Sequence, residues 1–189
     1  MSEDEYLAQA HLIDQQTVEI DPIETQGFIL DIGGGGEGII GKLNGEQVVA
    51  IDKRRDELEE TENPSLKIVM DATDLKFLDE SFKVATSFFT MMYIPNDLKP
   101  QIFAETYRVL RKGGCFHLWD TVIPEKVDDK KYFVIPLKVV MPEDTIETGF
   151  GVHLKKQDTQ SLKQLALEAG FKVEKEEAQE YTFYLRLEK

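Results

Sequence analysis

The sequence predicts an α/β protein in which a parallel sheet is covered by helices on both faces. Apolar segments of strand length alternate with helical segments, which is typical of a doubly wound sheet. A glycine-rich turn joins the first of these strands to a helix, as in folds that bind nucleotide cofactors. The chain has 189 residues, 41% of them hydrophobic, and can bury one sizeable core, so we expect a single domain over residues 1–189.

The most informative element is the strand predicted over 28–32, which runs into a glycine loop that opens a helix. Asp31 stands just before the turn. Glycines let the backbone turn tightly and approach a ligand, and the helix N-terminus beyond them offers free N–H groups. The segment therefore indicates a cradle for a nucleotide-like cofactor.

Two cofactors fit the glycine spacing. Gly33, Gly35 and Gly38 have the G-x-G-x-x-G spacing of dinucleotide-binding folds, and Asp52 ends the next predicted strand, so a NAD-dependent oxidoreductase is one reading. A carboxylate such as Asp31, however, would sit close to the phosphates of a dinucleotide. It suits a cationic or zwitterionic ligand better, and S-adenosylmethionine has a sulfonium and an α-ammonium group and no phosphate.

The loop resembles motif I of the class I S-adenosylmethionine-dependent methyltransferases, Asp/Glu-x-Gly-x-Gly-x-Gly. Asp31, Gly33 and Gly35 match this pattern, whereas Glu37 stands at the last glycine position and Gly38 follows one residue late. The resemblance covers residues 28–120 in sequential order. It implies a Rossmann-like domain with a mostly parallel seven-stranded sheet and an antiparallel C-terminal strand. It also implies S-adenosylmethionine as cofactor and methyl transfer to an acceptor, which we expect to be a small molecule.

The resemblance also assigns residues that follow the later strands. Asp52 is similar to the acidic residue that accepts hydrogen bonds from both ribose hydroxyls, a task suited to a carboxylate. Asp71 and Ala72, after the strand predicted over 66–70, are similar to the residues that bind the adenine. Lys83 replaces an acidic residue of the family pattern, and we expect it to lie at the surface. The implied cofactor-binding residues are Asp31, Gly33, Gly34, Gly35, Asp52, Lys53, Asp71, Ala72 and Phe88.

The second half of the chain continues the alternation. A helix is predicted over 97–111, ended by a double glycine, and another over 158–169. Segments 171–178 and 180–188 resemble the antiparallel strand pair that ends many methyltransferases. Residues 130–154 read as an inserted β-hairpin, which serves as a lid, as a homodimer contact or simply as an extension of the sheet. Residues 1–27 form a short N-terminal extension.

Catalytic residues are not singled out by the sequence. The sulfonium methyl is already electrophilic, so holding a nucleophile in line and excluding water can suffice without a general base. Polar candidates near strand ends are Tyr93, His117, Asp120 and His153. An apolar wall beside the methionine moiety is expected from Phe88, Phe89, Met91 and Met92, although such a cluster is also typical of a core.

Composition narrows the function classes. The net charge of −14 disfavours nucleic acids and anionic membranes as partners. The N-terminus is acidic and leads into no apolar stretch, so neither a signal peptide nor a membrane span is expected. The single cysteine, Cys115, reads as a buried thiol, which agrees with a cytoplasmic protein, and no metal is expected. Because Glu37 alters the motif and no base is evident, a non-catalytic cofactor-binding or assembly module is a further alternative.

Overall fold

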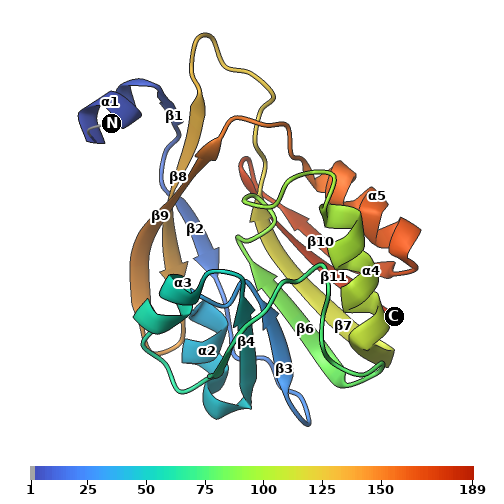
Figure 1. Cartoon of the computed structure of the whole chain (residues 1–189). Coiled ribbons are helices and arrows are strands. Elements are labelled where there is room, and N and C mark those ends of the chain that lie inside the picture. Colours follow the sequence, from blue (N-terminus) through green and yellow to red (C-terminus); the bar gives the residue numbers. More distant parts are fainter. Residues whose placement is uncertain (1–2) are drawn as a thin grey trace.

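The computed structural model describes residues 3–189, and its larger sheet has seven strands (Figure 1). Their order is β10-β11-β7-β6-β3-β4-β5. Strands β3 to β7 pair in parallel, β11 is antiparallel to β7, and β10 is antiparallel to β11. The strands are β3 (Ile29–Ile32), β4 (Val48–Asp52), β5 (Leu66–Val69), β6 (Phe82–Phe88), β7 (Leu110–Thr121), β10 (Lys172–Ala178) and β11 (Thr182–Glu188). The predicted fold class, including the antiparallel C-terminal strand, is confirmed.

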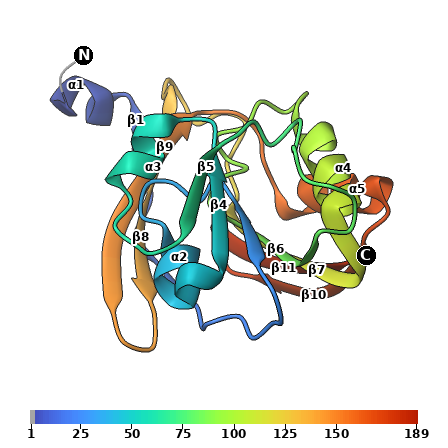
Figure 2. The ribbon, with the colours of Figure 1, turned by 60° about the horizontal axis from the view of Figure 1, so that its bottom comes forward.

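Helices cover this sheet on both faces, as Figures 1 and 2 show. On one face α4 (Lys99–Val109) and α5 (Thr159–Ala169) bury a core that includes Phe103, Phe116 and Leu162. On the other face lie α2 (Ile39–Asn44), the 3-10 turn η1 (Gly45–Gln47) and α3 (Arg55–Glu60). Helix α5 begins after the Asp158 cap and ends before Gly170, where φ is +106°, which agrees with the helix predicted over 158–169.

A second, four-stranded sheet packs beside α2 and α3. Its central strand β8 (Tyr132–Val140) pairs antiparallel with β9 (Thr145–His153), which confirms the predicted hairpin. Strand β8 also pairs in parallel with β1 (Ala10–Leu12) and β2 (Gln16–Glu19), which follow the short helix α1 (Glu3–Ala8). The sequence did not predict β1 and β2, because strands of three and four residues leave no periodicity to detect.

The inner face of β8 joins the second sheet to the seven-stranded one. Phe133, Ile135, Leu137 and Val139 alternate along the strand and are each 0% exposed. They belong to one buried cluster with Ile29 and other residues of β3, β4 and α2. The hairpin is therefore part of a core and is not a separate flap.

One boundary differs from the prediction. Helix α4 ends at Val109, and β7 begins at once, so the double glycine lies inside the strand. A Cβ on Gly114 would lie 2.7 Å from the carbonyl oxygen of Arg111 and 2.9 Å from that of Lys83. Gly113, with φ at +67°, also takes a conformation that favours glycine. The glycines thus allow an irregular, closely packed strand, whereas we expected them to end the helix.

Lys83 is exposed, as expected, and Cys115 is 8% exposed within β7. Among the described residues, no helix combines the length and the apolar character needed to cross a membrane. Because β3, β4, β5 and β6 are parallel, their carboxyl ends meet at one edge of the sheet. That edge is where ligands bind in open α/β sheets, and it carries the glycine loop.

Candidate functional site

The glycine loop after β3 is tied to the neighbouring strand. The N–H groups of Gly33 and Gly34 both donate to the carbonyl of Ile51, at 2.8 and 3.0 Å. Gly33 has φ at +74°, and a Cβ there would lie 2.3 Å from the side chain of Thr90. Thr90, which the sequence analysis did not single out, therefore packs directly against the loop.

Asp31 lies beneath this loop and does not face open solvent. The residue is 2% exposed, and Thr86 Oγ1 donates a 2.7 Å hydrogen bond to its carboxyl group. A Cβ on Gly34 would lie 2.6 Å from Asp31 Oδ2, so the loop closes over the carboxyl group. Burial raises its pKa to about 7; the bond from Thr86 opposes this rise and the charge of Asp52 adds to it.

Asp52 stands at the carboxyl end of β4, opposite the loop. Its Oδ1 accepts a 2.8 Å bond from the backbone N–H of Arg54. Its Oδ2 faces the loop, because a Cβ on Gly35 would lie 3.0 Å from it and 2.6 Å from the Cβ of Glu57. The structure thus brings Gly35 and Asp52 together, with only enough room for a glycine.

Asp71 follows β5 and is held by two neighbours. Its Oδ2 accepts from Lys53 Nζ at 2.9 Å, and its Oδ1 accepts from the backbone N–H and Oγ1 of Thr73 at 2.9 and 2.7 Å. These bonds, Lys53 first, lower the pKa of Asp71 to about 2, so it is ionised at neutral pH. Ala72 packs partly buried against the main core. The Lys53–Asp71 pair bridges the ends of β4 and β5 beside Asp52.

The altered motif position has a structural partner. Glu37 Oε1 accepts a 2.8 Å hydrogen bond from Thr148 Oγ1 on β9, so the loop is fastened to the hairpin. Gly38, the glycine that comes one residue late, has φ at +57°, and a Cβ there would lie 2.3 Å from Thr61 and 2.4 Å from Asn63. Packing against the segment after α3 thus explains Gly38, and the G-x-G-x-x-G spacing does not need a dinucleotide to account for it.

Aromatic rings from the hairpin and from the loop after β6 meet near this edge. Phe150 of β9 stacks on Phe89 with centroids 5.5 Å apart and meets Tyr93 edge-on at 6.4 Å. Burial of its hydroxyl raises the pKa of Tyr93 to about 12, although 49% of the residue is exposed. Phe88 meets Phe89 edge-on, with centroids 5.0 Å apart, and lies 6.1 Å from the ring of Trp119. The hairpin therefore adds Phe150, which was not expected from the sequence, to the rings of Phe89 and Tyr93 that follow β6.

Asp120 ends β7 in a buried polar network. It is 0% exposed, and it accepts bonds from Gln157 Nε2 at 2.7 Å, from the N–H of Thr121 at 2.8 Å and from the N–H of Met92 at 3.3 Å. Gln157 Oε1 in turn accepts from Lys99 Nζ at 2.6 Å. Burial raises the pKa of Asp120 to about 6 and lowers that of Lys99 to about 8. The carboxyl group thus holds the loop that begins after β6.

The other sequence candidates lie elsewhere. His117 bonds through Nδ1 to the Tyr184 hydroxyl at 2.8 Å on the open part of the sheet face, and burial lowers its pKa to about 4. His153 is exposed at the end of β9. Met91 and Met92 are 0% exposed and belong to the two cores, so they pack as core residues.

Comparison with known proteins gives a family match. Residues 30–118 match the family model described as a methyltransferase domain. A search of curated protein sequences returned no match.

Several solved structures share the fold. A protein of Pyrococcus horikoshii is 21% identical, with a TM-score of 0.63 over 87% of this chain and 82% of that chain. An S-adenosylmethionine-dependent methyltransferase of Methanosarcina mazei is 19% identical, with a TM-score of 0.63 over 89% of this chain and 94% of that chain. Another from Clostridium acetobutylicum is 12% identical, with a TM-score of 0.60 over 86% and 83%.

Proposed function

We propose that the chain is an S-adenosylmethionine-dependent methyltransferase, which the match of residues 30–118 to a methyltransferase domain supports, and that it methylates a small molecule held beside the β8–β9 hairpin. S-Adenosylmethionine is the cofactor that this family implies. The single observation that supports the acceptor site is the aromatic wall of Phe150 and Tyr93, which is backed by the buried ring of Phe89 and is bonded to the glycine loop through Glu37 and Thr148. This wall brings apolar rings to the carboxyl edge of the sheet.

The residues at that edge fit the cofactor. Gly35 leaves room beside Asp52 Oδ2 that a Cβ would fill, and we assign this carboxylate to the ribose hydroxyls. Asp71, ionised and held by Lys53, is assigned with Ala72 to the adenine. Asp31, beneath the loop, acts on the bound ligand through the position of the loop, since little of its carboxyl group is open to contact.

When bound, the cofactor supplies an electrophilic methyl group. The chain then has to bind and orient the acceptor and to exclude water. Phe150 and Tyr93 provide a surface for an acceptor with an apolar or aromatic part. Asp120 is a positioning residue, because its buried carboxyl group accepts hydrogen bonds from the N–H of Met92, from Gln157 and from Thr121 and so holds the loop after β6 in place.

Charge supports a small acceptor over a nucleic acid. The net charge of −14 opposes the approach of a nucleic acid backbone or an anionic membrane. A compact acceptor reaches the edge without bringing a long polyanion against this charge.

The test is transfer of labelled methyl groups. The protein is incubated with methyl-labelled S-adenosylmethionine and, separately, with the metabolite, nucleic acid and protein fractions of one cell extract. We expect label in the metabolite fraction only, and less of it with Phe150→Ala. Label in nucleic acid or protein would contradict the small-molecule acceptor. No label in any fraction, with the cofactor still bound, would favour a non-catalytic cofactor-binding module.

A further inference from the structure

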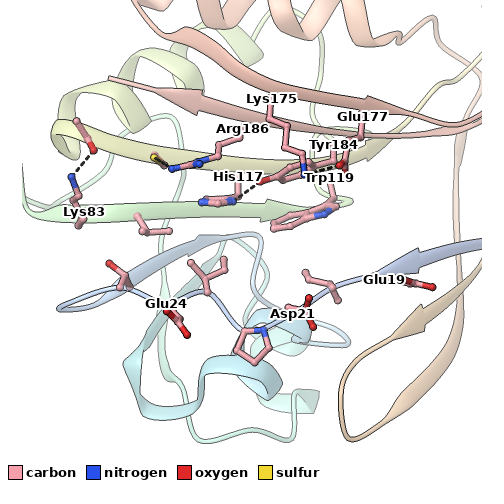
Figure 3. Close-up of a pocket in the computed structure, with 17 residues that line it drawn as sticks. Glu19, Asp21, Glu24, Lys83, His117, Trp119, Lys175, Glu177, Tyr184 and Arg186 are labelled. Atoms are coloured by element: carbon pink, nitrogen blue, oxygen red, sulfur yellow. Dashed lines mark hydrogen bonds and ion pairs between the residues drawn. The ribbon is translucent and has the colours of Figure 1, made fainter.

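A cavity of about 540 Å³ lies away from the glycine loop, on the face of the sheet that α4 and α5 leave uncovered (Figure 3). One wall is formed by β6, β7, β10 and β11, and the other by residues 19–25, which begin at the last residue of β2. The cavity reaches Lys83 and Gly113, near the starts of β6 and β7, whereas the glycine loop lies at the carboxyl edge. A neighbouring cavity of about 470 Å³ shares Trp119 and Tyr184 with it.

The cavity is held open by bonds that tie the segment to other elements. The side chain of Asn44 bonds both the N–H and the carbonyl of Ile23, at 3.2 and 2.9 Å. Gln47 Nε2 donates to the carbonyls of Thr25 and Gly27, at 2.8 and 2.7 Å. These contacts hold the segment on the side of α2 and η1 and leave the space above β7 free. The cavity is therefore preformed, and its volume is within the range of small-molecule sites.

Aromatic rings line the sheet wall. His117 and Trp119 stack with centroids 5.9 Å apart, and Trp119 and Tyr184 lie 4.8 Å apart. His117, whose pKa lies far below neutrality, adds no positive charge here. The side chains of β3 and β4 on the same face of the sheet are aliphatic and are buried in the core. The part of the face that lines the cavity is instead aromatic and polar. Such rings suit the stacking of an aromatic group.

The two walls carry opposite net charges that do not meet. The sheet wall holds Lys83, Arg186 and the Lys175–Glu177 ion pair, and the segment wall holds Glu19, Asp21 and Glu24 (Figure 3). Within residues 3–189, none of the ion pairs found joins the two walls. Among the residues that the structure describes, the guanidinium group of Arg186 is held only by a 3.4 Å contact to Cys115 Sγ and a 3.9 Å contact to Glu174. Its donor fork is therefore available to a carboxylate.

From this arrangement we propose that the cavity binds an aromatic α-amino acid, as a site separate from the methyltransferase edge. The ligand carboxylate pairs with Arg186, the ammonium group with Asp21 and Glu24, and the ring packs against Trp119 and Tyr184. A zwitterion satisfies both walls at once, whereas an anion or a cation alone leaves one wall facing a like charge.

The chain carries its own reporter, because Trp119 is its single tryptophan. The fluorescence of Trp119 is followed while wild-type protein is titrated with L-phenylalanine, with phenethylamine, which lacks the carboxylate, and with 3-phenylpropionate, which lacks the ammonium group. We expect a saturable change with L-phenylalanine at a midpoint below about 1 mM. Both analogues are expected to bind about tenfold or more weakly. Excess S-adenosylhomocysteine is expected to leave the phenylalanine midpoint unchanged.

Matched variants test which group of the ligand each wall binds. Arg186→Gln and the double variant Asp21→Asn/Glu24→Gln are each expected to weaken L-phenylalanine about tenfold. The control Arg55→Gln, on the exposed helix α3, is expected to bind as the wild type does. Equal binding of phenethylamine and L-phenylalanine would overturn the proposal, and so would the lack of a saturable change with any of the three probes. Displacement of L-phenylalanine by S-adenosylhomocysteine would also overturn it, because the two sites would then be one.

Discussion

The carboxyl group of Asp31 is held where a negative charge is unfavourable. It is buried beneath the glycine loop, with one hydrogen bond from Thr86, and burial raises its pKa from 3.8 to about 7. A raised carboxyl pKa means that the folded chain binds its proton more tightly than the unfolded chain does. The resulting stabilisation is fully present below about pH 4 and is lost as the pH rises through about 7.

Asp31→Asn is therefore expected to be more stable than the wild type at pH 8, by about 4 kcal/mol. The advantage should shrink toward pH 4, where the wild-type carboxyl is also neutral. Denaturant unfolding at pH 4, 6 and 8 measures it, with the exposed Asp14→Asn as control. An advantage that does not change with pH would show that Asp31 is ionised in the folded protein.

Glu37, which stands where the family motif has a glycine, has a structural role in this chain. Its bond to Thr148 joins the loop to a strand far along the sequence. Thr148→Val keeps the shape of the side chain and removes the donor, and we expect it to cost about 1–2 kcal/mol of the free energy of unfolding. Thr145→Val, at the exposed start of the same strand, serves as its control and should cost less than about 0.5 kcal/mol.

The loop and the hairpin are also expected to be coupled at the level of these elements. In the wild type, S-adenosylhomocysteine should slow hydrogen exchange of the β9 amides, because binding orders the loop to which the hairpin is bonded. In Thr148→Val this slowing should be smaller. Equal slowing in both proteins would show that the bond carries no coupling.

The aromatic wall gives a second test at the element scale. Phe150→Ala removes the ring that contacts Phe89 and Tyr93 and is expected to lower methyl transfer by about tenfold or more. Affinity for S-adenosylhomocysteine should stay within about twofold, since the ring faces the proposed acceptor. Phe28→Ala, at a residue that is 58% exposed, is the control. A matching loss of cofactor affinity would place Phe150 in the cofactor site instead.

For the molecule as a whole, the inserted hairpin is a structural element as well as a wall. Its inner residues are buried with those of β3 and β4, so removal of residues 130–154 would open the second core. Ile135→Ala should cost about 2–5 kcal/mol. Trp119 fluorescence and far-ultraviolet circular dichroism should report one shared transition. Two separate transitions would show that the sheets fold independently.

The sequence predicted the features whose signals are local. The glycine loop, the capped helix α5, the hairpin and the alternation of strands and helices all appear where expected. The association of β1 and β2 with β8 was missed, because short parallel pairings between distant segments leave no local pattern. For the same reason, Thr90, Phe150 and the Glu37–Thr148 bond are recognised only once the chain is folded. The double glycine was misread because a strand irregularity and a helix end use the same residue type.

At the scale of the whole molecule, we expect the carboxyl edge of the seven-stranded sheet to bind S-adenosylmethionine through Asp52. Calorimetric titration with S-adenosylhomocysteine tests it most directly, with NADH as competitor and Asp56→Ala on exposed α3 as control. We expect micromolar binding of S-adenosylhomocysteine to the wild type and to the control, binding at least about tenfold weaker to Asp52→Ala, and no binding of NADH. Binding of NADH without S-adenosylhomocysteine, or undiminished binding to Asp52→Ala, would contradict it.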